Sequence, residues 1–137
     1  MTIVDKIKKS VTTATQVPVY YQSIEQINAL LDQAQFPCAY LFLLEQGRMT
    51  EDFREIVDVQ VFFVQPTGYD YVAVENEKLI DEMKQTAIKW LSNLNQDELF
   101  RLNAVTSTNR VYDQFDVVLT GYSVSVTLEE TERPCVE

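Results

Sequence analysis

The twelve residues from Phe53 to Val64, FREIVDVQVFFV, constrain the fold of this chain more than any other stretch. Apolar and polar side chains alternate along it, and alternation of period two places the two sets on opposite faces of a β-strand. The apolar residues at odd-numbered positions are Phe53, Val57, Val59, Val61 and Phe63. Ile56 and Phe62 interrupt the other set, so we expect that face to be only half exposed. The pattern predicts a long central strand with helices packed on its odd-numbered face.

Apolar periodicity predicts further elements on both sides of this strand. Ser23 and Gln26 have the spacing of a capping box, and Thr2 is available as an N-cap for an amphipathic helix. In chain order we expect a helix over 2–14, an edge strand over 17–21, a helix from Ser23 to before Pro37, and strands over 38–44 and 53–64, followed by a helix over 72–94 and strands over 99–105 and 114–129. The fold class is therefore α+β, with an antiparallel-rich sheet, a long hairpin and helices packed on one face. The order is ferredoxin-like, with an added N-terminal helix and an extra C-terminal strand.

Two polar segments interrupt the predicted strands. Glu45–Asp52, EQGRMTED, is predicted to form an eight-residue hairpin tip, and Thr106–Asp113, TSTNRVYD, a second turn. Long hairpin loops are uncommon and often functional. The first segment is therefore either a binding loop or a plain connecting loop. In the last strand the apolar positions change from odd to even across Thr120–Gly121. One extra residue at a glycine predicts a β-bulge there.

Length and charge limit the domain organisation and the partners. A chain of 137 residues is one domain by ordinary priors, and we expect a single domain over 1–129 followed by a flexible acidic tail over 130–137. The net charge is −10, and the first ten residues hold three lysines and one aspartate, so the rest carries −12. Such a surface repels phosphates, which predicts no specific nucleic-acid partner.

The residues of common enzyme and metal sites are missing from the sequence. No histidine is present, and Cys38 and Cys135 form no zinc-binding pattern, so both are expected to be free thiols. Gly121-x-Ser123-x-Ser125 resembles a nucleophile elbow but lies inside a strand pattern and lacks the second glycine. We therefore predict no catalytic, cofactor-binding or metal site. No apolar run approaches 18 residues and the N-terminus lacks a signal-peptide h-region, so no membrane partner is expected.

Three stretches carry a resemblance to a known family: YLFLLEQGRMTEDFREIVDVQVFFV, EKLIDEMKQTAIKWLSNL and QFDVVLTGYSVSVTL. An N-terminal helix, a long hairpin, a long helix and a hairpin that ends in a long strand resemble the tail-terminator or tail-completion (neck) proteins of tailed phages. The resemblance implies a non-enzymatic virion protein that forms a ring, often a hexamer. It also implies other tail or neck proteins as partners, and a place in the virion after assembly in the host cytoplasm.

The two polar segments and the N-terminal lysines are the expected contacts between neighbouring subunits. Each polar segment carries an arginine in an otherwise acidic chain, and arginine forms bidentate bonds with carboxylates. The expected interface residues are Lys6, Lys8, Lys9, Arg48, Met49, Arg110 and Tyr112. Two other functions remain open. A ferredoxin-like ligand-binding or regulatory module would show an apolar pocket with convergent polar groups. An enzyme is the weakest alternative, because acid–base groups are missing.

Overall fold

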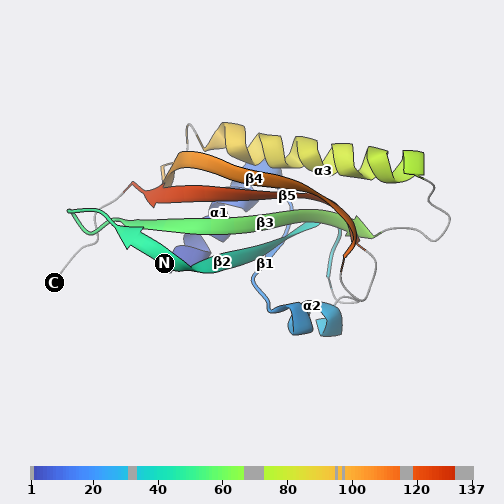
Figure 1. Cartoon of the computed structure of the whole chain (residues 1–137), viewed down its shortest axis with the longest axis horizontal. Helices are drawn as coiled ribbons and strands as arrows, with labels where there is room; N and C mark the ends of the chain where they lie inside the picture. The colour runs from blue at the N-terminus through green and yellow to red at the C-terminus, as the bar shows by residue number, and fades with distance from the viewer. Residues whose placement is uncertain are drawn as a thin grey trace.

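The computed structural model describes residues 2–30, 34–66, 73–94, 96, 98–114 and 119–131. They form an α+β fold in which the two longer helices pack on one face of a mixed sheet, as the sequence predicted (Figure 1). In chain order the elements are α1 (Ile3–Thr15), β1 (Val19–Tyr20), α2 (Ile24–Leu30), β2 (Cys38–Met49), β3 (Glu55–Pro66), α3 (Ala73–Asn93), β4 (Phe100–Gln114) and β5 (Leu119–Glu130).

The five strands lie in the order β1-β2-β3-β5-β4 across the sheet. The chain order of elements is the predicted ferredoxin-like one, but β1 and β2 are direct neighbours with no strand between them, so the sheet does not have the ferredoxin-like arrangement. β3 pairs with β2 on one side and β5 on the other, both antiparallel, so the predicted central strand does lie in the middle. β4 pairs with β5, which confirms the expected C-terminal hairpin. β1 runs parallel to β2, its direct neighbour, and the two are joined through α2, so the short strand lies at an edge. An edge position suits Pro18, because proline cannot donate to a strand ladder.

The main core lies between the sheet and the helices α1 and α3. Four odd-numbered residues of β3 point into it, as the alternation predicted, and all four are nearly inaccessible to solvent: Val57, Val59, Val61 and Phe63. Trp90 of α3 is fully buried against Phe63, with 6.3 Å between the ring centroids. Its indole Nε1–H donates to the Ser10 hydroxyl of α1 over 3.0 Å. This bond satisfies a polar group that would be costly to bury alone and fixes α1 against α3.

A smaller core lies on the opposite face of the sheet. Its buried members are Ile27, Cys38, Tyr40, Val64, Val111 and Leu119. Ile27 belongs to α2, so this helix packs on the face opposite α1 and α3 (Figure 1). The prediction that the helices share one face therefore holds for the two long helices and is corrected for α2. The second core also explains why the even-numbered face of β3 is only partly exposed.

The two cores account for the change of parity in β5. Val124, Val126 and Leu128 belong to the main core, whereas Leu119 belongs to the smaller one. The register between β5 and β3 is continuous throughout, so the predicted bulge at Thr120–Gly121 is wrong. The irregularity lies on β4, because residues 111 and 114 face residues 121 and 119 of β5.

Gly121 has a different role, which is to allow two strands to approach closely. A Cβ atom placed on Gly121 would lie 1.9 Å from the carbonyl oxygen of Phe63 in β3. Any other residue would force β3 and β5 apart at the centre of the sheet. The glycine therefore serves packing between strands and not a bulge.

The helix starts follow the sequence signals. Thr2 is the N-cap of α1: its hydroxyl accepts from the Asp5 N–H over 3.1 Å, and the Asp5 carboxylate accepts from the Thr2 N–H over 3.1 Å. Ser23 and Gln26 form the predicted capping box at the start of α2, with distances of 3.0 and 3.2 Å. Each pair satisfies N–H groups that have no partner within the helix.

Both predicted polar loops belong to strands instead. In β2, Gly47, Arg48 and Met49 pair with residues 57, 56 and 55 of β3 after an irregularity, so the tip of the hairpin is limited to residues 50–54. The segment Thr106–Asp113 is part of β4 and pairs along β5. Runs of polar side chains suggest loops in a sequence. Whether such a segment forms a strand depends on the hydrogen bonds that its backbone makes with the neighbouring strand. Glu130, predicted to start the flexible tail, is the last residue of β5. Residues 115–118 of the predicted last strand and 132–137 of the tail lie outside the described residues.

Candidate assembly interface

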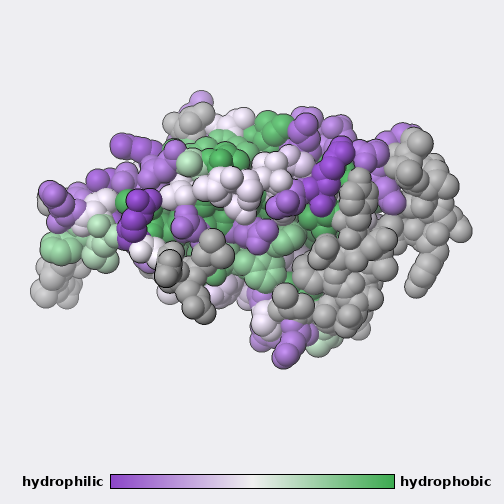
Figure 2. All heavy atoms as spheres, in the orientation of Figure 1, coloured by the Kyte–Doolittle hydropathy of each residue, from purple (hydrophilic) through white to green (hydrophobic). Residues whose placement is uncertain are grey.

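The turn between β2 and β3, together with the strand residues next to it, spans residues 48–55 and is called here the hairpin end. It lies at one extreme of the long axis, beyond the start of β4 (left in Figure 1). Two predicted interface residues, Arg48 and Met49, are exposed on it, and the Met49 side chain is 62% accessible. In Figure 2 hydrophobic and hydrophilic residues lie side by side at this extreme of the molecule. The hairpin end is therefore the described place where predicted contact residues gather.

The turn at the hairpin end is closed by two backbone hydrogen bonds. The N–H of Phe53 donates to the carbonyl of Thr50 over 3.0 Å, and the N–H of Thr50 donates to the carbonyl of Arg54 over 2.8 Å. Phe53 has a φ of 67°, which places it in the left-handed region. This is the arrangement of a three-residue hairpin loop whose last residue has a left-handed conformation, a position that glycine usually occupies.

Phe53 carries a cost at this position. A residue with a Cβ atom pays about 1–2 kcal/mol to adopt the left-handed conformation. Its side chain gains little burial in return, because it remains 62% accessible. A bulky residue with positive φ is unusual, and such outliers concentrate at functional sites. Phe53 was predicted to point into the core as the first residue of the central strand, and the structure corrects this: β3 begins at Glu55.

Side-chain contacts fix the turn from within. The Thr50 hydroxyl donates to Asp52 over 2.5 Å and accepts from the Arg54 N–H over 2.9 Å. The Arg54 guanidinium Nε lies 3.0 Å from both Asp52 carboxylate oxygens. The Thr50 hydroxyl and then the Arg54 guanidinium lower the pKa of the Asp52 carboxyl, and the bond to Asp52 raises the pKa of Arg54. All three residues are therefore held in one conformation at neutral pH.

The C-terminal end of β5 braces the hairpin end from outside. Arg54 Nη1 lies 3.4 Å from Glu129 Oε2 and 3.4 Å from the Glu130 carbonyl oxygen. Glu130 Oε1 accepts from the Glu55 N–H over 3.1 Å, and its Oε2 accepts from Lys6 Nζ over 2.6 Å. Glu130 thus links α1, β5 and the hairpin end. Charged side chains that are mostly shielded from water hold geometry better than exposed pairs, and the Glu129 and Glu130 side chains are only 14% and 16% accessible.

The other predicted interface residues are scattered. Lys6 has its acidic partner within the same chain, and so does Arg110, whose Nη2 lies 2.7 Å from Glu77 of α3. Lys8 is half-buried and Lys9 exposed on α1. Tyr112 belongs to β4, but its side chain lies outside the described residues. Their contact with neighbouring subunits stays a prediction.

Among the residues that the structure describes, no three histidine, cysteine or acidic side chains gather where a metal ion could bind. Burial raises the pKa of the Cys38 thiol to about 12, which keeps it protonated and unreactive. Ser123 is buried in the middle of β5, so the Gly121-x-Ser123 pattern lies in a strand and not on a turn. Cys135 lies outside the described residues.

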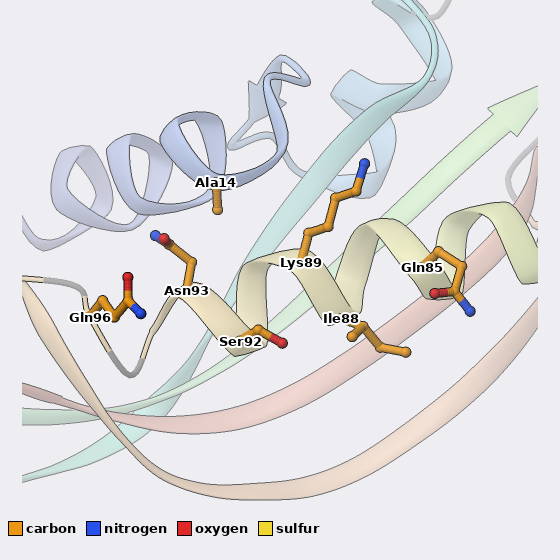
Figure 3. A pocket seen from close by; sticks show the side chains of 7 residues that line it. All are labelled: Ala14, Gln85, Ile88, Lys89, Ser92, Asn93 and Gln96. Carbon is orange, nitrogen blue, oxygen red and sulfur yellow. The ribbon is translucent and has the colours of Figure 1, made fainter.

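The largest of the clefts described lies between α1 and the end of α3 and has a volume of about 440 Å³. Figure 3 shows that its side chains diverge: Asn93 points toward Ala14, whereas Ile88 and Gln85 point to another side of α3. A binding site for a small molecule needs polar groups that converge. This cleft offers no such convergence.

Arg48 and Met49 were predicted interface residues, and their contact with another subunit stays a prediction. The sequence did not indicate the exposed position of Phe53 or the contacts of Glu129 and Glu130 with the hairpin end. A local signal for the turn was present in Thr50-x-Asp52, because both residue types form side-chain bonds to nearby backbone. No local signal identifies Glu130 as the partner of Lys6, since 124 residues separate the two.

No helix in the described part of the chain has both the length and the apolar character to cross a membrane. A scan against models of protein families and a search of curated proteins gave no match to this chain.

Proposed function

We propose that this chain is a non-enzymatic structural subunit of a tailed-phage virion, which assembles into a ring at the end of the tail or at the neck. Its partners would be further copies of itself, six in the form that the family resemblance favours, and other tail or neck proteins. The proposal places the protein in the virion after assembly in the host cytoplasm. It rests on the layout that resembles tail-terminator and neck proteins, together with the chemistry of the hairpin end.

The observation that carries the proposal is the combination found at the hairpin end. Met49 and Phe53 are each 62% accessible, and Phe53 is held in an unfavourable backbone conformation. The Arg54–Glu129 ion pair and the hydrogen bond from the Glu55 N–H to Glu130 join the same segment to β5. Glu130 in turn pairs with Lys6 of α1. A rigid apolar projection loses little conformational entropy on binding, which is what an assembly contact requires. Exposed apolar patches that are rimmed by polar residues are a common feature of protein contacts.

Clefts of about 280 and 330 Å³ are also present, and these bear on the alternative of a ligand-binding module. The second is lined by Lys9, Ser10, Thr13, Asn93, Gln96, Glu98 and Leu99, which are mostly polar. Small-molecule sites are usually apolar clefts of about 300–1,000 Å³. The alternative therefore has weaker support than assembly and stays open to a ligand screen.

Electron microscopy of the purified protein in negative stain tests the proposal. We expect annular particles of uniform diameter, because a heterologous contact whose rotation closes generates a ring. Addition of purified tail tubes should place such particles at tube ends. Monomers in every condition would contradict the proposal, and so would open filaments that show no preferred length.

A further inference from the structure

The hairpin end has a candidate counterpart elsewhere on the same chain. A cleft of about 280 Å³ lies where the chain turns from β1 into α2, beside the middle of β2. It is lined by Tyr21, Gln22, Ser23, Gln26, Phe42 and Leu43. In Figure 1 α2 lies below the sheet, away from the hairpin end along the long axis. The molecule thus carries an apolar projection and, at a different place, a recess lined by three aromatic or aliphatic and three polar side chains.

The recess lies at an open edge of the sheet. β1 pairs with β2 only at Ala39 and Tyr40, so within the described residues Phe42 and Leu43 have a partner strand on the β3 side alone. Tyr21 is 49% accessible, which leaves an aromatic wall uncovered. At about 280 Å³ the cleft is smaller than the 300–1,000 Å³ typical of small-molecule sites. It is of a size for protruding side chains.

Charges next to the two features are complementary. Arg48 adjoins Met49 on the hairpin end and is exposed, and within the described residues it makes no ion pair. Glu25 is exposed in the first turn of α2, between cleft residues Ser23 and Gln26. Because each copy carries a net charge of −10, copies repel one another at long range. A contact that brings arginine to a carboxylate offsets this repulsion and sets the orientation.

We propose that the hairpin end of one copy inserts Met49 and Phe53 into the cleft beside α2 of a second copy, with Arg48 facing Glu25. The inference rests on the proposed function and specifies how its subunits meet. The contact is heterologous, since different surfaces of the two copies join, and such contacts produce closed rings when the rotation permits. Phe53 and Met49 act as the buried anchors, and the neighbouring β2 edge supplies additional polar contact.

The variant Phe53→Gly separates assembly from folding. Glycine adopts the left-handed conformation without penalty, so the midpoint of urea unfolding should rise relative to the natural protein under conditions that keep both monomeric. The same variant should lose the oligomer in light scattering, because the anchor is gone. Ile88→Ser, which removes an exposed apolar side chain from α3, is the matched control and should retain the oligomer. Retention of the full oligomer by the stable Phe53→Gly protein would overturn the inference.

A charge exchange provides a second test. Arg48→Glu and Glu25→Arg should each reduce assembly at least tenfold in apparent association constant, and the double variant should recover most of the loss. Failure of the double variant to exceed either single variant would reject the Arg48–Glu25 pairing.

Photo-crosslinking from a benzophenone amino acid at position 53 identifies the occupant of the contact directly. Crosslinks to the peptides that hold residues 21–26 or 42–43 of another copy are expected. Crosslinks to residues 48–55 of another copy would instead indicate a symmetric dimer through two hairpin ends. That result would overturn the proposed insertion into the cleft beside α2 but not self-assembly. A natural protein that remains monomeric would remove both the docking and the proposed function, so the two failures are distinguishable.

Discussion

At the scale of single residues, Phe53 and Ser10 show opposite uses of an unusual placement. Phe53 is exposed in a conformation that suits glycine, so its presence weakens the monomer and leaves an aromatic ring available for contact. Ser10 is a polar residue in the main core, and its hydroxyl accepts from Trp90. The exposed ring of Phe53 is available to another molecule, whereas the hydrogen bond of Ser10 fixes the packing of helices within the chain.

The Ser10–Trp90 hydrogen bond should appear in a double-mutant cycle. Ser10→Ala leaves the indole N–H buried without that acceptor and should cost about 1–3 kcal/mol in the free energy of unfolding. Trp90→Phe should cost more, since it also leaves space in the core. The double variant should be less destabilised than the sum of the two, because the hydrogen bond between the two side chains can be lost only once. Urea unfolding followed by circular dichroism measures all four proteins, and strict additivity would contradict the assignment.

Asp5 should make the stability of α1 depend on pH. The hydrogen bonds from Thr2 lower the pKa of its carboxyl below the ordinary value of 3.8. A carboxyl whose pKa is lowered by folding stabilises the folded protein at pH values above 3.8. That contribution is lost as the pH falls through the lower pKa of the folded state. The difference in unfolding midpoint between the natural protein and Asp5→Asn should therefore be largest near neutral pH and shrink below 3.8. A difference that grows on acidification would contradict this role.

At the scale of elements, one central strand and one helix organise the core. β3 directs its odd-numbered residues toward α3, and α3 directs Ile80, Met83, Ala87 and Trp90 toward the sheet. α1 completes this layer through Ile7 and Val11. Lys6 of α1 forms an ion pair with Glu130 at the base of the hairpin end. The packing of α1 in the core therefore also supports the position of the hairpin end.

Charges introduced into this layer should unfold the protein. Val59→Asp in β3 and Met83→Asp in α3 each bury an unpaired carboxylate, and each should cost several kcal/mol in the free energy of unfolding. Ile88→Asp is the matched control on α3, because its side chain is 42% accessible. We expect it to change stability by about 0.5 kcal/mol or less beyond helix propensity. Equal loss in the core and control variants, measured by urea unfolding, would contradict the assigned faces of α3.

The central strand, the long helix and the starts of α1 and α2 could be predicted from the sequence, because their signals are local. Alternation fixes the faces of β3, and a serine three residues before a glutamine fixes the start of α2. The strand character of residues 45–49 and 106–113 could not be predicted, because their polar side chains resemble loops and only the partner strand decides pairing. Of the hairpin end, the sequence predicted that Arg48 and Met49 contact a neighbouring subunit, and this stays a prediction. Phe53 was missed because alternation alone assigned it to the strand.

At the scale of the whole molecule, self-association in place of nucleic-acid binding remains our proposal, and shape and charge are the observations behind it. A body with one apolar projection and one recess can join copies head to tail. The acidic surface opposes phosphate, and the few cations near the N-terminus are partly engaged, since Lys6 already pairs with Glu130. The ring that we propose would surround DNA without holding it.

The protein should show no measurable binding to duplex DNA at physiological salt. Useful phosphate binding needs about 6–10 contacts, and the N-terminal helix offers three lysines at most. Fluorescence anisotropy of a labelled duplex, titrated with the natural protein, measures this. Changing Lys8 and Lys9 to glutamate, which leaves the Lys6–Glu130 pair in place, provides the control. Salt-sensitive binding that this variant abolishes would restore a nucleic-acid role for α1.

The central claim is that copies of this chain form a closed ring through the hairpin end, and native mass spectrometry tests it most directly. The natural protein should give one dominant species whose mass is a fixed integer multiple of the chain mass, with six copies as the number that the resemblance favours. Phe53→Gly should shift that species to the monomer while its unfolding midpoint rises. A natural protein that is monomeric at every concentration, or a ring of unchanged mass in Phe53→Gly, would contradict the account.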